Sequence, residues 1–312
     1  MEIKEIKKFY LNHQVFFIFH ILFIVLLFLG IVNMRKIWYN QQKYIKEYGM
    51  QIKHDFHIHT SLSVCAKETA TVEHYFNVAQ RLGLNKIGFS DHFWDSSFDA
   101  PNDFYRTQDY EHVSRLKPML ENAPEGLNVY FGCEAEYDPK RRDVGITEET
   151  AEKFDFIIVP NSHTHMMMPK DFYEPYEKHA EFMIESYNNI LDSKVSKYIT
   201  AMAHPFMAVA CPYNNGILID MIPDDTYKRL FDKTANKGIA FEINISSMHG
   251  KTKEQIEALS QIRIFRLAKQ CGCKFLFGTD SHNDQRHSSF SNAEFVAEIL
   301  ELKETDIADI AR

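Results

Sequence analysis

The sequence contains few cysteines and no excess of basic residues. Among 312 residues there are 5 cysteines, and 35 Lys and Arg residues are outnumbered by 43 Asp and Glu residues. An odd number of scattered cysteines argues against a disulfide scaffold and favours a reducing compartment. The net charge of −8 provides no basic field along the whole chain, so general nucleic-acid binding is disfavoured.

The rest of the composition is that of an ordinary globular protein. Hydrophobic residues make up 45% and charged residues 25%, which excludes a disordered or collagen-like chain, and no internal repeat is visible. The length is about twice that of a typical domain, although a single α/β barrel also fills it. Histidine is the unusual component, with 15 residues.

One long apolar run lies near the N-terminus, at residues 15–32, with His20 as its polar interruption. As a helix it would extend about 27 Å, close to the hydrocarbon core of about 30 Å. We therefore expect an N-terminal segment, residues 1–50, with a candidate transmembrane helix at residues 15–32. The alternatives are a removed signal peptide, which lacks a cleavage site here, a peripheral apolar helix, or translation from a start codon set too early. The flanking basic residues slightly favour a cytoplasmic C-terminal part.

From residue 51 onward, short apolar runs alternate with segments of helical period. The candidate strands are residues 52–59, 86–92, 128–136, 155–163, 198–204, 239–245 and 274–280. Apolar residues at helical spacing predict a helix from Val72 to Leu82, ended by Gly83, and another across Ile256 to Leu267. Acidic residues after Thr147 and at Asp224 mark further helix starts. Seven strand–helix units predict a parallel TIM-like (β/α)7 barrel over residues 51–312 rather than two domains.

Each of the seven runs carries His, Asp or Glu at or near its end. These residues are His57, His59, Asp91, His92, Glu134, Glu136, His163, His165, His204, Glu242, Asp280 and His282. One such residue is ordinarily a hydrogen-bonded strand end, but strand termination does not require imidazole or carboxylate seven times. The C-terminal ends of barrel strands meet at one mouth, and gathering these groups there without cations is costly. We therefore predict two or three divalent metal ions.

Together these stretches resemble the polymerase and histidinol phosphatase (PHP) family of metal-dependent phosphoesterases. The matching stretches are His57-Ile58-His59-Thr60, Ser90-Asp91-His92, Gly132-Cys133-Glu134-Ala135-Glu136, Asn161-Ser162-His163, Ala203-His204-Pro205 and Gly278-Thr279-Asp280-Ser281-His282. They cover residues 53–283. The resemblance implies a distorted seven-stranded (β/α) barrel, which agrees with the strand count made above.

The resemblance also implies three metal positions. The first would be held by His57, His59, Glu134 and Asp280, with Glu134 bridging, and the second by Glu134, His163 and His204. The third would be held by His92, His282 and a residue of the loop after the first strand, where many family members have His and this chain has Cys65. Thiolate suits zinc and not manganese, so the metal stays open among Zn, Mn and Fe. A small buried side chain is the other interpretation of Cys65, and His165 is the other candidate for the position of His163.

The chemistry expected of this set is hydrolysis of a phosphate ester. Bridging metals would lower the pKa of a bound water and supply hydroxide as the nucleophile. Glu134 and Asp280 are the catalytic candidates; Asp280 or a metal-bound water would supply the proton for the leaving group. The substrate-binding candidates are Arg286 and Arg106, because guanidinium matches phosphate geometry, and Asn244 near the end of its strand; Arg141 and Arg142 also lie in mouth loops. Asp91 is expected to orient His92 or to cap the next segment.

A long aromatic segment follows the second predicted strand. It contains Phe93, Trp94, Phe98, Phe104, Tyr105 and Tyr110, which either form apolar walls for a small organic phosphate or close the rim of the barrel. Histidinol-phosphatase members of the family also have a long segment here and a Gly-x-Glu-x-acid-Tyr stretch, similar to residues 132–137. Histidinol phosphate is therefore one candidate substrate.

Three other functions stay open. An amidohydrolase-type barrel also opens with His-x-His, but it usually has eight strands and often a bridging lysine, which is missing at these strand ends. A phosphodiesterase or nuclease acting on short nucleotides would use the same metals, since the acidic chain argues only against extended nucleic acid. A non-catalytic metal-binding protein is disfavoured by the intact ligand set. We therefore expect a cytoplasmic phosphatase for a small phosphorylated metabolite, attached to a membrane if residues 15–32 are an anchor.

Overall fold

The computed structural model describes residues 50–208, 215–283 and 290–312. Ile52–Arg312 form one compact unit. The predicted transmembrane helix at residues 15–32 and the candidate Arg286 lie outside the described residues. Within the described ranges, no helix combines the length and the apolar composition that a membrane crossing requires.

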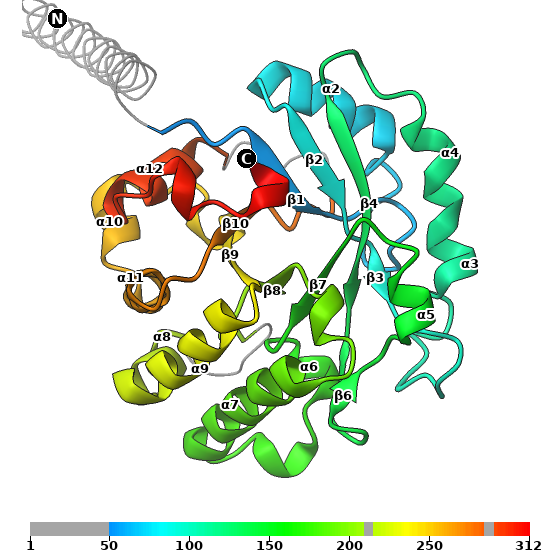
Figure 1. Ribbon diagram of the computed structural model, residues 1–312. Coiled ribbons are helices and arrows are strands. Elements are labelled where there is room, and N and C mark those ends of the chain that lie inside the picture. The colour runs from blue at the N-terminus through cyan, green and yellow to red at the C-terminus, as the bar shows by residue number, and fades with distance from the viewer. Residues whose placement is uncertain (1–49, 209–214, 284–289) are drawn as a thin grey trace, which may run out of the picture. The chain divides into compact units, whose positions relative to one another are not determined.

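Seven parallel strands form the central sheet and surround the interior of the molecule (Figure 1). In spatial order they are β1 (His54–Ile58), β2 (Lys86–Phe89), β4 (Asn128–Ala135), β7 (Phe156–Pro160), β8 (Ala201–Ala203), β9 (Ala240–Asn244) and β10 (Phe275–Gly278). The short β3 (His92–Phe93) pairs with β4. The two edges meet where His59 N donates to Ser281 O at 2.9 Å and Asp280 N donates to His57 O at 2.8 Å. The predicted seven-stranded, distorted TIM-like barrel is therefore confirmed, nearly closed at this seam.

Helices lie on the outside of the strands (Figure 1). The longer ones are α2 (Val72–Leu82), α7 (Tyr176–Asp192), α8 (Asn215–Met221), α9 (Asp224–Asn236), α11 (Ser260–Gln270) and α12 (Ser291–Ile299). The short ones are α3 (Tyr110–Val113), α4 (Lys117–Leu120), α5 (Glu148–Ala151), α6 (Thr164–Met167) and α10 (Lys253–Glu257). The prediction for α2 is confirmed. The Thr71 side chain accepts from His74 N at its start, and Gly83 ends it with a φ of 71°, a conformation that favours glycine.

Two local predictions differ from the structure. The helix expected across Ile256 to Leu267 is two helices, α10 and α11, because the backbone at Leu259 is extended with a ψ of 139°. The two pieces pack on different partners, α10 on α12 and α11 on α8 and α9, while Ile256 and Ile262 on either side are both buried, so the apolar pattern hides the break. An antiparallel hairpin of β5 (Tyr137–Asp138) and β6 (Asp143–Val144) was not predicted, because two-residue strands have no readable period.

Aromatic rings fill the part of the barrel interior beneath the strand ends. Gly88 on β2 and Gly132 on β4 leave room for the ring of Phe156, since a Cβ at these positions would lie 2.6 Å and 2.3 Å from it. Phe156 in turn packs edge-on against Phe56, with ring centroids 5.2 Å apart. Hydrocarbon occupies this level, and the predicted ligands lie at the C-terminal ends of the strands.

Candidate metal centre

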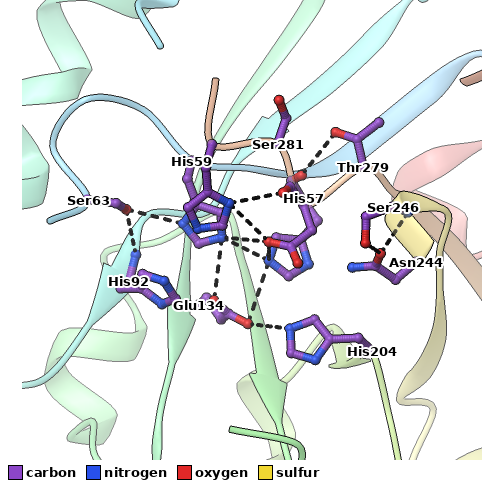
Figure 2. A network of polar contacts seen from close by, with 12 residues as sticks. His57, His59, Ser63, His92, Glu134, His204, Asn244, Ser246, Thr279 and Ser281 are labelled. Atoms are coloured by element: carbon purple, nitrogen blue, oxygen red, sulfur yellow. Dashed lines mark hydrogen bonds and ion pairs between the residues drawn. The ribbon is translucent and has the colours of Figure 1, made fainter. Parts of the chain in front are cut away.

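The strand ends bring most of the predicted ligands to one place. His57 and His59 come from β1 and the residue after it, and His204 and Asp280 follow β8 and β10. His92 on β3 is the register partner of Glu134 on β4. Figure 2 shows the side chains of His57, His59, His92 and His204 gathered around Glu134. The parallel register therefore assembles residues that are far apart in the sequence.

Glu134 lies at the centre of this cluster and is only 1% exposed. Its Oε1 atom lies 3.0 Å from His204 Nε2, 3.6 Å from His57 Nε2 and 3.7 Å from His163 Nε2. Its Oε2 atom lies 2.9 Å from His92 Nδ1 and 3.5 Å from His59 Nε2. Five imidazole rings thus face one carboxylate.

Asp280 closes the cluster on its more exposed side. Its Oδ1 atom lies 3.5 Å from His57 Nε2, 3.4 Å from His59 Nε2 and 3.4 Å from His282 Nδ1. The backbone of Asp280 has a φ of 50°, and that of His204 a φ of 25°. Non-glycine residues with positive φ are strained and are frequent at functional sites, so two of the ligand candidates are held in costly conformations by the surrounding barrel.

Four sets of side chains in the described part of the chain have ligand atoms close enough to hold a cation. They are His57, His59 and Glu134; His57, His204 and Asp280; His92, Glu134 and His163; and His59, His92 and His282. The first set contains three of the four residues predicted for the first metal position. The other sets differ from the predicted metal positions. His163 is grouped with His92 instead of His204, and His59 takes the place predicted for Cys65 beside His92 and His282. Cys65 is exposed, and desolvation with the nearby Glu134 and Asp280 carboxylates raises the pKa of its thiol to about 12.

The pKa values of two neighbouring imidazoles are shifted in opposite directions. Burial lowers the pKa of both His57 and His59. At His57 the carboxylates of Glu242, Glu134 and Asp280 outweigh burial and raise its pKa well above the usual value. At His59 the rings of His282 and His92 add to burial, so its pKa lies well below the usual value. The two Nε2 atoms are 3.0 Å apart, so they share one proton. This proton belongs to His57, and His59 offers its lone pair.

Two buried atoms of the cluster indicate that its residues fit divalent cations. Glu134 Oε2 and His92 Nδ1 have no hydrogen-bond partner, although they lie 2.9 Å apart. Leaving buried polar atoms unpaired costs about 1–3 kcal/mol each. A divalent cation would take lone pairs from imidazole and carboxylate at once. The imidazoles of His163, His57 and His92 also overcome the effect of burial and hold the pKa of Glu134 well below its usual range, which keeps it an ionised ligand.

Four imidazoles of the cluster are held in the same way by their outer nitrogen. His57 Nδ1 lies 2.8 Å from Glu242 Oε1, His59 Nδ1 3.2 Å from Ser63 Oγ, His163 Nδ1 2.7 Å from Glu136 Oε2, and His204 Nδ1 2.5 Å from Ser162 Oγ. Such partners fix the tautomer and orientation of a metal-binding imidazole. In each case Nε2 faces the interior of the cluster.

Sequence reasoning found only part of this outer layer. Glu242 and Glu136 were visible because they end predicted strands. Ser63, Ser162 and the hydroxyl of Tyr105, which donates to Glu136 Oε2, gave no signal, because hydroxyls are common in loops. Asp91 was expected to orient His92 or to cap the next segment, and it is linked to His92 through Ser63, whose Oγ accepts from His92 N at 3.2 Å. Its carboxylate accepts from the backbone and hydroxyl of Thr60 and from Ser63 Oγ, so it fixes the loop after β1.

His163, and not His165, lies in the cluster. His163 is 8% exposed and faces Glu134. His165, two residues further on in α6, is exposed. The helical turn that starts at Thr164 replaces the extended segment in which both would share a face.

Of the predicted substrate-binding residues that the structure describes, Arg106 is engaged at the surface, whereas Asn244 adjoins the cluster, since its Nδ2 donates to Glu242 Oε1 at 3.5 Å. Arg106 is exposed and pairs with Asp103 at 2.7 Å. Asn244 is buried, and its Oδ1 accepts from the backbone and hydroxyl of Ser246. Among the other arginines, Arg142 pairs with Glu185.

The aromatic segment partly closes the rim. Trp94 and Tyr105 are buried with Met167, and Phe98, Ala100, Phe104 and Met166 pack against them. Next to this core lies a pocket of about 400 Å³, whose lining includes Trp94, Phe98, Asp138, Lys140 and Arg141. The guanidinium of Arg141 stacks on Phe98, 3.4 Å from the ring centroid.

Comparison with known proteins identifies the family. The PHP domain matches residues 55–246, more than half of the sequence. The chain belongs to the PHP family. The enzyme class predicted from the sequence, a metal-dependent phosphoesterase, is the class of this family. A probable phosphatase of Proteus mirabilis is 25% identical to this PHP protein over 247 residues, which cover 79% of this chain and 84% of that protein.

Two solved structures resemble this PHP domain. Histidinol phosphate phosphatase of Lactococcus lactis, determined with zinc, L-histidinol and phosphate, has a TM-score of 0.57 at 15% identity and covers 83% of this chain and 99% of that chain. A putative histidinol phosphatase of Listeria monocytogenes has a TM-score of 0.58 at 14% identity, over 75% of this chain and 97% of that chain. At these identities the likeness shows a common barrel fold.

Proposed function

We propose that this PHP protein hydrolyses a small phosphate monoester at a centre of two or three divalent metal ions. The observation that carries the proposal is the burial of Glu134 among five imidazoles, with Asp280 at the exposed side of the same cluster. The likeness to a probable phosphatase supports phosphate ester hydrolysis, and the fold shared with a histidinol phosphatase supports a monoester as substrate.

The proposed ligands are His57, His59, His92, Glu134, His163, His204, Asp280 and His282, with Cys65 as a candidate that needs its own test. Zn, Mn and Fe all suit a set of imidazoles and carboxylates. Such ions would lower the pKa of a bound water and neutralise charge on the phosphoryl oxygens. Glu134 touches both halves of the cluster through its two oxygens, so it is the proposed bridge.

Asp280 is the proposed proton carrier. Burial opposes its ionisation, but the imidazoles of His57, His59 and His282 hold the pKa of Asp280 well below its usual range. Its carboxylate is therefore ionised and available to accept a proton, although the same imidazoles make it a weaker base. The side chain is 20% exposed, so it is also accessible to the leaving oxygen, to which it returns that proton.

The organic part of the substrate is proposed to lie against the aromatic segment. Phe104 stands next to His92, with ring centroids 5.3 Å apart, so an apolar wall adjoins the cluster. Pockets with apolar walls and few polar groups are typical of small-molecule sites. A small organic phosphate of the kind of histidinol phosphate fits this description.

Hydrolysis and metal content of the purified full chain test the proposal. We expect two or three equivalents of metal, loss of p-nitrophenyl phosphate hydrolysis after chelation, and recovery with manganese or zinc. Asp280→Asn and His59→Ala should lower the rate by orders of magnitude, and Asp192→Asn, which changes a surface pair with Lys233, should not. A chain without metal after gentle purification would overturn the proposal.

The substrate class needs a separate comparison. A phosphomonoesterase turns over p-nitrophenyl phosphate faster than bis-p-nitrophenyl phosphate, and the opposite order would favour a diesterase acting on short nucleotides. A panel of phosphorylated metabolites that includes histidinol phosphate, assayed with manganese, then identifies the organic group. Equal rates for all members would contradict a selective pocket.

A further inference from the structure

A chain of hydrogen bonds links the aromatic segment to the ligand cluster. Tyr105 donates its hydroxyl to Glu136 Oε2. His163 Nδ1 lies 2.7 Å from the same oxygen, and His163 Nε2 lies 3.7 Å from Glu134 Oε1. The three side chains are buried, with exposures of 1% for Tyr105, 2% for Glu136 and 8% for His163. The segment after β3 therefore touches the cluster through one buried carboxylate.

The donors around Glu136 determine which nitrogen of His163 carries the proton. Glu136 Oε2 accepts from Tyr105, and Glu136 Oε1 accepts from the backbone N of Tyr137 at 3.1 Å. An ionised carboxylate only accepts hydrogen bonds, so its contact with His163 requires a proton on Nδ1. In the neutral ring, the form that binds a cation, the lone pair of His163 is then on Nε2, on the side of Glu134.

The position of Glu136 is itself fixed by the chain around it. Its carbonyl accepts from Gly145 N at 2.7 Å, so the turn after β6 holds the residue between β4 and β5. The ring of Tyr105 packs against Phe104 at 4.9 Å and Trp94 at 6.0 Å.

We propose that Glu136 and Tyr105 are positioning residues of the metal centre that act through His163. Glu136 holds the His163 ring with Nε2 towards Glu134, and Tyr105 holds the Glu136 carboxylate. This inference rests on one part of the proposed function, namely that His163 binds a divalent ion.

In Glu136→Gln, the side chain at position 136 no longer determines which nitrogen of His163 carries the proton. The amide has one acceptor oxygen, whereas the donors Tyr105, His163 and Tyr137 N contact two oxygens of the carboxylate. If the amide nitrogen faces His163, it donates to Nδ1 and moves the proton to Nε2, on the side of the metal. If the oxygen faces His163, the amide nitrogen meets the backbone N–H of Tyr137. Both arrangements weaken the ligand, and loss of such a partner typically costs 10- to 100-fold in metal affinity.

Cobalt titration of the full, metal-stripped chain tests the proposal, with visible absorption and the dissociation constant of Co²⁺ as readouts. Glu136→Gln should raise this constant about 10- to 100-fold and change the cobalt spectrum. Tyr105→Phe, which keeps the ring, should raise it about 2- to 10-fold, the value of one hydrogen bond. In the Glu136→Gln background, Tyr105→Phe should add nothing, because Tyr105 acts through Glu136. A purely structural role would lower the melting temperature and leave the spectrum of bound cobalt unchanged.

A matched pair on the surface is the control. Tyr198 donates to Glu152 Oε1 at 2.6 Å, away from the ligand cluster, so Tyr198→Phe and Glu152→Gln should leave cobalt binding unchanged. An unchanged dissociation constant and spectrum in Glu136→Gln, or an undiminished effect of Tyr105→Phe in the double variant, would overturn the inference while phosphatase activity stands. A wild-type chain that binds no cobalt would overturn the metal centre and this inference together.

Discussion

The Nδ1 atom of His57 lies 2.8 Å from the Oε1 atom of Glu242. Glu242 Oε2 also accepts from the backbone N of His204. One carboxylate of β9 thus holds a side chain from β1 and the backbone after β8, across the interior of the barrel. Glu242 is 1% exposed, so neither interaction competes with bulk water, and both His57 and His204 depend on it for their orientation.

Glu242→Gln should therefore weaken metal binding. His57 and His204 N contact different oxygens of Glu242, and the amide has only one oxygen. One of the two buried donors therefore loses its partner. We expect the zinc dissociation constant, measured by chelator competition, to rise about 10- to 100-fold. Glu257→Gln, which changes a surface pair with Arg266, should leave the constant unchanged. Equal constants for Glu242→Gln and wild type would contradict this role.

Gly278→Ala should disturb the same pair from the opposite side. A Cβ at Gly278 would lie 2.2 Å from Glu242 Oε1 and 2.4 Å from the Cβ of His57, so one of them must move. We expect a loss of about 1–3 kcal/mol in the free energy of unfolding, measured by denaturant titration, together with weaker zinc binding. Gly126→Ala meets no atom within 4 Å, so it should cost stability through its positive φ and leave zinc binding intact. Intact zinc binding in Gly278→Ala would show that the site tolerates the displacement.

His163→Ala and His165→Ala should differ sharply. His163 faces Glu134 and Glu136 from inside the cluster, whereas His165 is exposed in α6. We expect His163→Ala to reduce p-nitrophenyl phosphate hydrolysis by at least about 10-fold and to lower the metal content. His165→Ala should keep both close to wild type. A larger loss in His165→Ala would reverse the assignment.

Asp95 should make stability depend on pH in the acid range. Burial opposes its ionisation, but hydrogen bonds from Ser97 N and from the backbone and hydroxyl of Thr147 lower the pKa of Asp95 from 3.8 to about 2. Because the folded-state pKa is the lower one, this stabilisation is present above about pH 4 and is lost as the pH falls towards 2.

Asp95→Asn should therefore lower the free energy of unfolding at pH 7 by about 2 kcal/mol. The difference from wild type should shrink below pH 4, as measured by denaturant titration of the metal-free chain. Asp99→Asn, at an exposed position of the same segment, should have little effect at either pH. A difference that stays constant from pH 7 to pH 3 would exclude ionisation as the source.

Local sequence patterns determined the barrel and the edge at which its site lies. Apolar runs ending in His, Asp or Glu depend on near neighbours, and the parallel connection of seven such runs places their ends together. His57, His59, Glu134, His204 and Asp280 could therefore be named in advance as members of one site, whichever partner each one contacts.

Only the tertiary structure decided the contacts within that site. His57 and Glu242 are 185 positions apart, and their meeting depends on strand twist and on the space that Gly278 leaves, which no local pattern records. The same holds for Tyr105, whose hydroxyl reaches Glu136 because the aromatic segment folds over the rim, and for His165, which a short helical turn leaves exposed outside the cluster. Residue type and spacing determine which groups can act, whereas packing across the barrel determines which of them meet.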